Sequence, residues 1–350
     1  MTTRKKALVA GGLGVIGRNL VEYLAAREDW EVIGLSRRAP PAGTPGRYLQ
    51  VDLLDADDTA ARLGALDDVT HVFHAAYQEH DSPQALVDAN LGMLRNLVET
   101  VSAASPALQR AVLYQGAKYY GAHLGAFRTP AREDDARHMP PVFYYDMQDW
   151  LLACADSRPW DAVMLRPDVV CGFAVGNPMN LAMLIAVYAS ISKALGLPLR
   201  FPGTATCYGK LAQVTDATHL ARGSVWAATQ AASGHAYNIT NGDLFRWNQL
   251  WPEVARWFDL ELGEPQTLPL AQYMADKGPL WQSLVERHGL QPVPYAQIAA
   301  WGFGDFVFRS DWDVISSTTR IRQAGFGEVV DSTQMFLRLF QEFRERRVIP

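Results

Sequence analysis

The sequence contains few cysteines and none of the patterns in which cysteine commonly binds a metal. Its 350 residues include three cysteines, which are widely spaced and form neither a CxxC pair nor a cluster with histidine. Closely organised thiols are needed for a disulfide framework or a cysteine-bound metal, so this spacing favours reduced cysteines in a cytoplasmic protein. We therefore predict a cytoplasmic location and no metal site.

Long hydrophobic runs and a surplus of basic residues are also missing. The most apolar stretch, residues 163–199, is interrupted by charged residues and prolines, and no run reaches the length of a membrane span. The formal net charge is −5, whereas a nucleic-acid surface is usually basic. Residues 1–6 lead into the first predicted strand without the apolar core of a signal peptide. We expect neither a membrane nor a nucleic acid as a partner.

What the sequence does contain is an alternation of short apolar runs with amphipathic segments. This alternation predicts an α/β protein with a Rossmann-type, doubly wound parallel sheet. The predicted strands cover residues 7–10, 31–35, 48–51, 70–73, 110–114 and 162–166. The predicted helices among them cover residues 18–26, 90–101 and 143–155.

After about residue 172 the alternation gives way to helices. We expect these at 180–195, 212–230, 247–258, 280–288 and 332–346, with one short strand at 237–241. A chain of 350 residues is long for a single core. The sequence therefore predicts a Rossmann NADP-binding core over residues 1–172, to which some later segments return. Residues 173–350 are expected to form a smaller, mainly helical, substrate-binding lobe.

Three glycines follow the first predicted strand at the spacing Gly-x-x-Gly-x-x-Gly, namely Gly11, Gly14 and Gly17. Glycines between a strand and a helix let backbone N–H groups approach a pyrophosphate at the positive end of the helix. The pattern carries weight because it lies between a predicted strand and a predicted helix at the start of the chain. We therefore predict a nucleotide-binding site here.

The end of the second predicted strand bears on which nucleotide binds. An acidic residue there commonly holds the ribose 2′-hydroxyl of NADH, but this chain has Ser36, Arg37 and Arg38. The fork of an arginine suits the 2′-phosphate of NADPH, although two solvated loop arginines are the alternative. We predict NADPH or NADP as the cofactor. Asp52, after the third strand, is placed either to bind an adenine amino group or to form a turn.

The chain lacks the helical Tyr-x-x-x-Lys pair of many nicotinamide-dependent reductases in the helix after Phe143. One literal match exists, from Tyr114 to Lys118, but Tyr114 ends a predicted strand and Gly116 interrupts any helix. The side chains of such a pair would not stack. We therefore expect Lys118 to act with a tyrosine from another segment, and Tyr114 to be structural or a pocket wall.

Several motifs make the chain similar to the progesterone 5β-reductase/iridoid synthase family, a divergent branch of the extended short-chain dehydrogenases. They are Gln115-Gly116-Ala117-Lys118-Tyr119-Tyr120, Phe143-Tyr144-Tyr145 with Asp149, and Arg166-Pro167 with Phe173, extended by Asn241-Gly242-Asp243 and the closing Val348-Ile349-Pro350. The resemblance implies that Lys118 and Tyr144 form the catalytic pair. It also implies pocket walls at Tyr77, Asn180 and Trp312, with Val314 or Ile315 as alternatives to Trp312.

The family resemblance further implies 1,4-reduction of an enone or enal, with hydride from NADPH reaching the β-carbon. Tyr144, supported by Lys118, would stabilise the enolate. The expected cofactor-binding residues are Gly11, Gly14, Val15, Ile16, Gly17, Ser36, Arg37, Arg38, Asp52, Leu53, Ala75, Ala76, Gln115, Lys118, Tyr144, Pro167, Val169 and Val170.

Other functions on the same scaffold stay open at this point. An NADP-dependent carbonyl reductase or an NAD-dependent sugar epimerase or dehydratase would also place a tyrosine and a lysine near nicotinamide. A nucleotide-sensing protein without catalysis is an alternative of a different class. The expected partner is a small carbonyl compound, and a homodimer is a further possibility.

Overall fold

A computed structural model describes residues 4–350. Residues 1–3, which belong to the segment predicted to lack the apolar core of a signal peptide, lie outside the described residues. Seven strands form one parallel sheet in the order β10-β6-β5-β4-β1-β2-β3. Their bounds are β1 Lys5–Ala10, β2 Trp30–Ser36, β3 Arg47–Gln50, β4 His71–His74, β5 Arg110–Tyr114, β6 Asp161–Pro167 and β10 Ala236–Ile239. The order reverses between β1 and β4, which is the switch point of a doubly wound sheet. The predicted fold class is confirmed.

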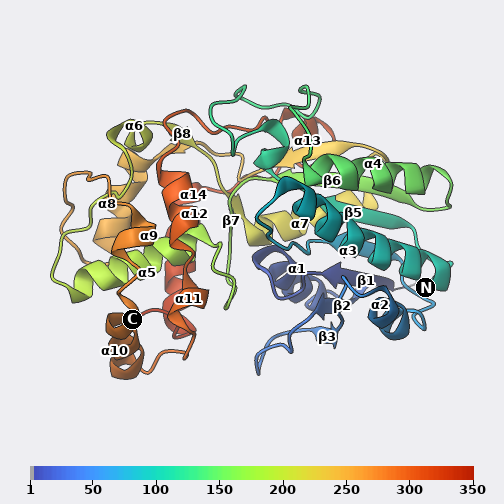
Figure 1. The fold of residues 1–350 in the computed structure, drawn as a ribbon, viewed down its shortest axis with the longest axis horizontal. Helices are drawn as coiled ribbons and strands as arrows, with labels where there is room; N and C mark the ends of the chain where they lie inside the picture. The colour runs from blue at the N-terminus through green and yellow to red at the C-terminus, as the bar shows by residue number, and fades with distance from the viewer. Residues whose placement is uncertain (1–3) are drawn as a thin grey trace.

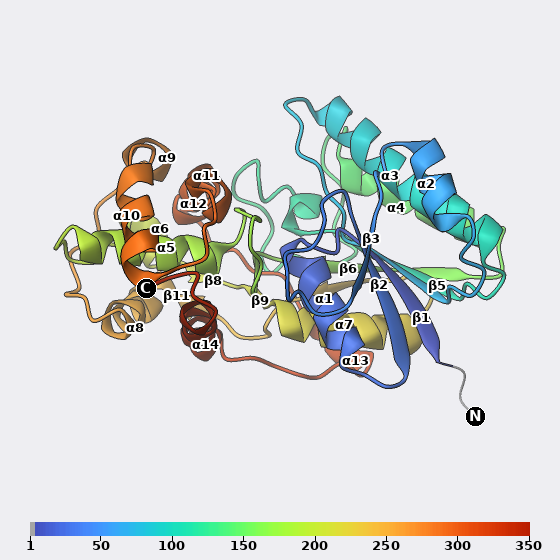
Figure 2. The same cartoon turned by 90° about the horizontal axis from the view of Figure 1, so that it is seen from below.

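Helices cover both faces of this sheet, because its strands send apolar side chains alternately to each side (Figures 1 and 2). One face packs against α1 (Val15–Ala25) and α7 (Ala217–Thr229). The other packs against α3 (Pro83–Ala104) and α4 (Phe143–Asp156), with α2 (Ala56–Leu63) beside α3. Side-chain caps at Asp55, Ser82 and Asp216 begin α2, α3 and α7.

Most of the second half of the chain forms a helical body beside the carboxyl ends of the strands (Figure 1). Its helices are α5 Leu181–Ala194, α6 Ala205–Tyr208, α8 Trp247–Trp257, α9 Leu270–Tyr273, α10 Gly278–His288, α11 Tyr295–Ile298, α12 Trp301–Phe308 and α14 Ser332–Glu345. Helix α5 is apolar nearly all round and buried from Leu181 to Ser192, and α11, α12 and α14 pack against it. Phe201, Trp251 and Phe308 make edge-to-face contacts in this core.

Three later elements return to the first body: α7 and β10 join the sheet layers, and α13 (Thr319–Gln323) packs on β10. Two short strand pairs join segments that are far apart in the sequence. They are β7 (Val170–Cys171) with β9 (Thr215–Asp216), and β8 (Leu211–Ala212) with β11 (Phe245–Arg246). The helix predicted at 212–230 is therefore wrong at its start. Over residues 4–350, no helix has the length and apolar character that a membrane crossing needs.

Two other helix starts differ from the sequence prediction by three residues or more. Helix α1 begins at Val15, directly after the glycine-rich turn, and α3 begins at Pro83, seven residues before the predicted start at residue 90. Proline is favoured in the first turn of a helix, and the Ser82 hydroxyl accepts from the backbone N–H of Ala85. The α2 helix was not predicted, because it is short and polar overall, with only Thr59 and Leu63 buried.

Two helical glycines offer a matched test of this packing. In Gly17→Ala the added Cβ would lie 2.3 Å from the Gly11 carbonyl oxygen, whereas in Gly92→Ala it meets no atom within 4 Å. We expect Gly17→Ala to lower the free energy of unfolding by about 1–3 kcal/mol through overpacking. Gly92→Ala should raise it by up to about 1 kcal/mol through helix propensity. Urea denaturation would measure both, and equal changes would contradict the packing role of Gly17.

Candidate active site

One cavity of about 800 Å³ runs along the carboxyl ends of β1, β2, β4, β5 and β6 and continues against the helical body. Ligands of open α/β sheets bind at this edge, at the switch point. Segments from both halves of the chain supply its wall. The part formed by the helical body is largely apolar and includes Leu211, Val214, Trp247, Phe303, Val307, Trp312 and Val314.

The glycine-rich turn forms one end of the cavity wall. Gly11 has φ +73, and a Cβ there would lie 2.6 Å from the Ala75 carbonyl oxygen. Gly14 precedes α1 without a side-chain cap, and the first turn of α1 carries no acidic residue. The first N–H groups of α1 are therefore open to an anion, and the turn fits a pyrophosphate.

Gly17 differs from its two partners in the motif, because it does not line the cavity. It is buried against Gly11, with space for no side chain. Its inclusion among the cofactor-contacting residues is corrected: it allows the close approach of α1 to the turn that Gly11 and Gly14 form. The remaining predicted cofactor residues line the cavity, namely Val15, Ile16, Ser36, Arg37, Arg38, Asp52, Leu53, Ala75, Ala76, Gln115, Lys118, Tyr144, Pro167, Val169 and Val170.

The arginines after β2 lie on the cavity wall with limited protein contacts. The Arg38 guanidinium donates to the Gly176 carbonyl at 3.3 Å, and that of Arg37 donates to the Gln78 side chain at 3.5 Å. Neither forms an ion pair within residues 4–350, so both can accept a phosphate as counterion. Asp52 lines the cavity and also accepts from the backbone N–H of Leu54 at 3.1 Å, so it forms a turn as well.

Tyr144 enters the cavity from the first turn of α4, and its hydroxyl lies over the chain after β5. A Cβ on Gly116 would be 3.2 Å from the Tyr144 hydroxyl oxygen and 3.5 Å from the Pro167 carbonyl oxygen. The absence of a side chain at Gly116 therefore makes room for the phenol. Its neighbour Tyr145 points away and packs on Tyr119, donating to that residue's carbonyl at 2.7 Å.

The environment keeps the Tyr144 phenol neutral. Burial raises the pKa of Tyr144, and the carboxyl groups of Asp168 and Glu79 raise it further. A neutral phenol is a hydrogen-bond donor. This arrangement is suited to stabilising negative charge that develops on a bound carbonyl oxygen, and less suited to removing a proton as a phenolate.

Lys118 lies on the same cavity wall, in the 3-10 turn Ala117–Tyr120 that follows β5. Its ammonium is 5.7 Å from the ring centroid of Tyr77, which packs on Phe143 at the start of α4. Lysine and tyrosine thus line one cavity although they belong to separate segments. Tyr77 is also a wall of the pocket, as predicted, and its hydroxyl bonds to the Glu79 carboxylate.

A buried guanidinium holds these two segments in place. Arg166, near the end of β6, is 2% exposed, and it donates to the Gln115 side chain at 2.8 Å and the Gln148 side chain at 3.0 Å. Gln115 in turn donates to the Tyr144 carbonyl at 2.9 Å. The guanidinium carbon is 3.4 Å from the ring centroid of Tyr119, in the turn that carries the lysine.

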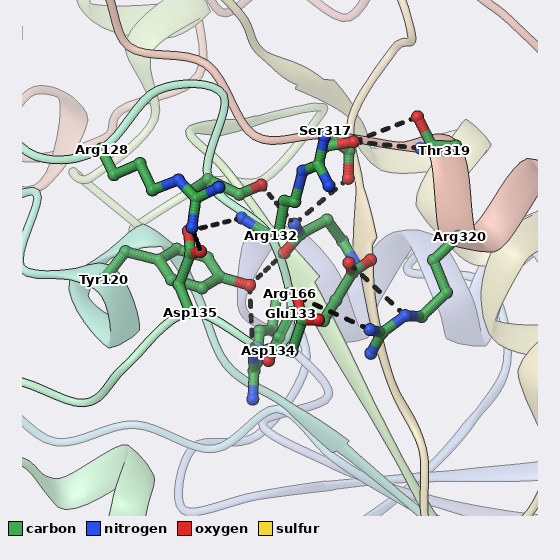
Figure 3. A network of polar contacts seen from close by, with 12 residues as sticks. Tyr120, Arg128, Arg132, Glu133, Asp134, Asp135, Arg166, Ser317, Thr319 and Arg320 are labelled. Atoms are coloured by element: carbon green, nitrogen blue, oxygen red, sulfur yellow. Dashed lines mark hydrogen bonds and ion pairs between the residues drawn. The ribbon is translucent and has the colours of Figure 1, made fainter.

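The same cation extends the network to a loop and to a third strand (Figure 3). Arg166 donates to the Tyr120 hydroxyl at 2.9 Å and to the Glu133 carbonyl at 3.1 Å. The Glu133 carboxylate accepts from the backbone N–H of Asn238 in β10 at 2.8 Å, and Arg320 lies 3.7 Å from it. The loop around residue 133, β10 and the segment after residue 315 are thereby tied to the active-site end of β6.

Tyr114 and Asn180 do not belong to the site. Tyr114 is 6% exposed on the opposite face of the sheet, where its hydroxyl bonds to Ser224 of α7 at 2.5 Å. Asn180, predicted as a pocket wall, is not among the residues that line the cavity, and its side chain donates to the Gly172 carbonyl at 2.6 Å. Trp312 and Val314 both line the cavity, whereas Ile315 does not.

Sequence reasoning missed several residues of the wall. Asp168 directly follows Arg166-Pro167 and lies between the predicted cofactor residues Pro167 and Val169, so the sequence alone could have identified it. Lys210 and Trp247 come from the helical body, and His123 from the loop after the 3-10 turn. No local pattern marks these three, because they reach the cavity only through the packing of the two bodies.

A doubly wound sheet with a glycine-rich turn at its switch point, together with a tyrosine and a lysine at its carboxyl edge, defines an oxidoreductase of the extended short-chain dehydrogenase/reductase class. Residues 50–350 match the family described as the PRISE-like Rossmann-fold domain. The chain belongs to this family. The resemblance inferred from the sequence motifs is thereby confirmed.

Relatives cover nearly the whole chain. A 3-oxo-Delta(4,5)-steroid 5-beta-reductase of Arabidopsis thaliana is 30% identical, over 98% of this chain and 93% of its own. An (S)-8-oxocitronellyl enol synthase of Nepeta racemosa is 31% identical over the same shares. Among solved structures, a putative epimerase of Burkholderia cenocepacia aligns with a TM-score of 0.70 at 18% identity, over 99% of this chain and 100% of its own, and a likeness at that identity shows the fold alone.

The Arg166 network makes a prediction about stability. In Arg166→Lys a single ammonium cannot reach four acceptors from three segments or lie flat on Tyr119, so we expect the free energy of unfolding to fall by about 3 kcal/mol. Arg158→Lys is the matched control, because Arg158 makes one exposed bond to Ser102 and should change stability by less than about 0.5 kcal/mol. Urea denaturation measures both. Similar values for the two variants would contradict the network's role.

Proposed function

We propose that this protein is an NADPH-dependent reductase of activated alkenes, acting on enones or enals by 1,4-reduction. The observation that carries the proposal is that the neutral Tyr144 phenol and Lys118 line one cavity at the carboxyl edge of the sheet, opposite the largely apolar wall of the helical body. Relatives support it, because a 3-oxo-Delta(4,5)-steroid 5-beta-reductase is named for reducing a carbon–carbon double bond conjugated with a carbonyl group. The three free thiols favour a cytoplasmic location, which belongs to the same proposal.

The residues present fit a phosphorylated dinucleotide. The open N–H groups at the start of α1 would hold the pyrophosphate, and Arg37 and Arg38 would hold a 2′-phosphate. Asp52 and Leu53 would contact the adenine, and Lys118 the hydroxyls of the nicotinamide ribose. When bound, the reduced nicotinamide supplies a hydride to the β-carbon of the substrate.

The protein's own contribution is to stabilise the charge that this reduction creates. As negative charge grows on the substrate carbonyl oxygen, the Tyr144 hydroxyl donates a hydrogen bond to it. Lys118 holds the local geometry and adds a positive charge nearby. The apolar wall of the helical body excludes water, which strengthens both interactions.

Substitution of the tyrosines tests the assignment of the donor. Tyr144→Phe should lower kcat for an enone by about 10²–10³, because one preorganised donor to the oxyanion is lost. Tyr114→Phe should leave kcat unchanged and cost about 1 kcal/mol of stability through the lost bond to Ser224. NADPH oxidation with a panel of enones, enals and saturated ketones is the measurement. Turnover of saturated ketones alone, or loss of activity only in Tyr114→Phe, would contradict the proposal.

The arginines test the choice of cofactor. Arg37→Ala should raise KM for NADPH about tenfold or more and leave KM for NADH unchanged, because only the former has a 2′-phosphate. The surface variant Arg47→Ala, on β3 and outside the cavity, serves as the control and should alter neither constant. A tenfold preference of the unmodified enzyme for NADH would remove the role given to Arg37.

A further inference from the structure

A buried carboxyl group on the cavity wall has a free oxygen that nothing in the proposed mechanism uses. Asp168 is 8% exposed and lines the cavity just after β6. Its Oδ2 atom has no hydrogen-bond partner, and its carboxylate forms no ion pair, within residues 4–350. A buried polar atom without a partner is costly, so such an atom on a ligand-binding wall points to a partner on the ligand.

The backbone holds this side chain firmly. The Asp168 N–H donates to the Thr215 hydroxyl at 3.1 Å, and the same hydroxyl donates to the Asp168 carbonyl at 2.6 Å. The next residue, Val169, has φ +32, which is unfavourable for a β-branched residue. Strained backbone of this kind persists where the surroundings over-determine it, commonly at ligand sites. This second observation is independent of the unpaired oxygen.

The position of Asp168 limits which part of a dinucleotide it can meet. Its neighbour Pro167 lies with its carbonyl beside Gly116, at the place where the Tyr144 hydroxyl also arrives. The reacting end of the cofactor must lie near that hydroxyl. Phosphates are excluded by charge, and they are matched at the other end of the cavity by the α1 N-terminus and the two arginines. A nicotinamide nucleotide has two kinds of donor at this end, the ribose hydroxyls and the N–H of the carboxamide. We assign the hydroxyls to Lys118, which leaves the carboxamide N–H for Asp168.

We propose that the Asp168 carboxylate accepts a hydrogen bond from the carboxamide of the nicotinamide and thereby fixes the orientation of the ring. The inference rests on the nicotinamide cofactor of the proposed function, but it does not depend on which substrate is reduced. Asp168 is then a positioning residue, which decides the face of the ring presented to the cavity. It acts beside Tyr144 and Lys118 and replaces neither.

The electrostatics give this contact a pH dependence. Burial raises the pKa of Asp168 to about 7, opposed by the backbone N–H of Val169. The Tyr144 phenol of α4 is the titratable group shown to interact with this carboxyl group. Lys118 lines the same cavity, and Asp216, next to Thr215 in β9, is paired with Arg338. A carboxamide N–H bonds the ionised carboxylate more strongly than the protonated acid. Binding should therefore tighten as the pH rises through about 7.

The first test needs no substitution. Dissociation constants of NADP⁺, of its 3-acetylpyridine analogue and of adenosine 2′,5′-bisphosphate are measured by fluorescence or calorimetry at pH 6 and pH 8.5. The analogue lacks the carboxamide N–H but keeps the ring charge, and the bisphosphate reports the adenosine end alone. We expect the preference for NADP⁺ over the analogue to be about tenfold larger at the higher pH. A preference that does not change with pH would overturn the proposal.

Variants provide the second test. Asp168→Ala should weaken NADP⁺ binding about tenfold or more at pH 8.5, without weakening the bisphosphate. Asp168→Asn keeps an oxygen acceptor, so it should bind NADP⁺ with intermediate affinity and without the pH dependence. Asn also removes a buried charge, so thermal unfolding above pH 7 should show a variant at least as stable as the parent. Equal losses for NADP⁺ and the bisphosphate would show a purely structural role and overturn the proposal.

The two proposals can fail separately. Loss of the pH effect in an enzyme that still reduces enones would remove only the role of Asp168. Persistence of the pH effect in a protein that reduces no enone would remove only the proposed reaction. If NAD⁺ proves to be the tighter ligand, NAD⁺ and its own 3-acetylpyridine analogue replace the phosphorylated pair, with adenosine 5′-monophosphate as the control.

Discussion

The active end of the molecule depends on one buried cation, the guanidinium of Arg166. Removing a cation from water is costly unless its donors find acceptors, and here four of the five N–H donors bond to Gln115, Tyr120, Gln148 and the Glu133 carbonyl. These acceptors come from segments that no local preference brings together. Satisfying one charge therefore fixes the turn after β5, the start of α4 and a loop against the end of β6. Lys118 and Tyr144 can then line one cavity from different segments, because their relative position is set by the cation rather than by a shared helix.

The two ends of the cavity beside this network differ in charge. At the adenosine end, the open N-terminus of α1 and the arginines after β2 provide a positive field for phosphates. Near Tyr144, burial keeps the phenol protonated and raises the pKa of Asp168 to about 7, so that carboxyl group is only partly ionised at neutral pH. A site of this kind favours a neutral substrate whose charge develops only during reaction. The apolar wall supplied by the helical body lowers the local dielectric constant, which strengthens the stabilisation of a charge that develops there.

Much of the backbone path was predictable from local sequence. The strand at residues 110–114 has its predicted limits, and the helix at 143–155 differs by one residue, because period-2 and period-3.6 patterns follow from burial on one or two faces. The predicted helix at 212–230 was wrong at its start. There the chain is drawn into short strand pairs with residues 170–171 and 245–246, and these contacts outweigh helical propensity. Gly17 shows the same limit, since spacing identified a glycine but not whether it faces the ligand or the neighbouring turn.

The sequence by itself determined the class of fold and the glycine-rich turn, and it predicted Lys118, Tyr144 and the two arginines that line the cavity. Those features are carried by periodicity and by residue types at fixed spacing, which are local properties. Only the tertiary structure decided that Tyr114 is structural, that Asn180 is buried away from the pocket, and that Asp168 has an unpaired oxygen at the reacting end. The physical reason is that burial and hydrogen-bond partners come from segments far apart in the chain, so no local pattern records them.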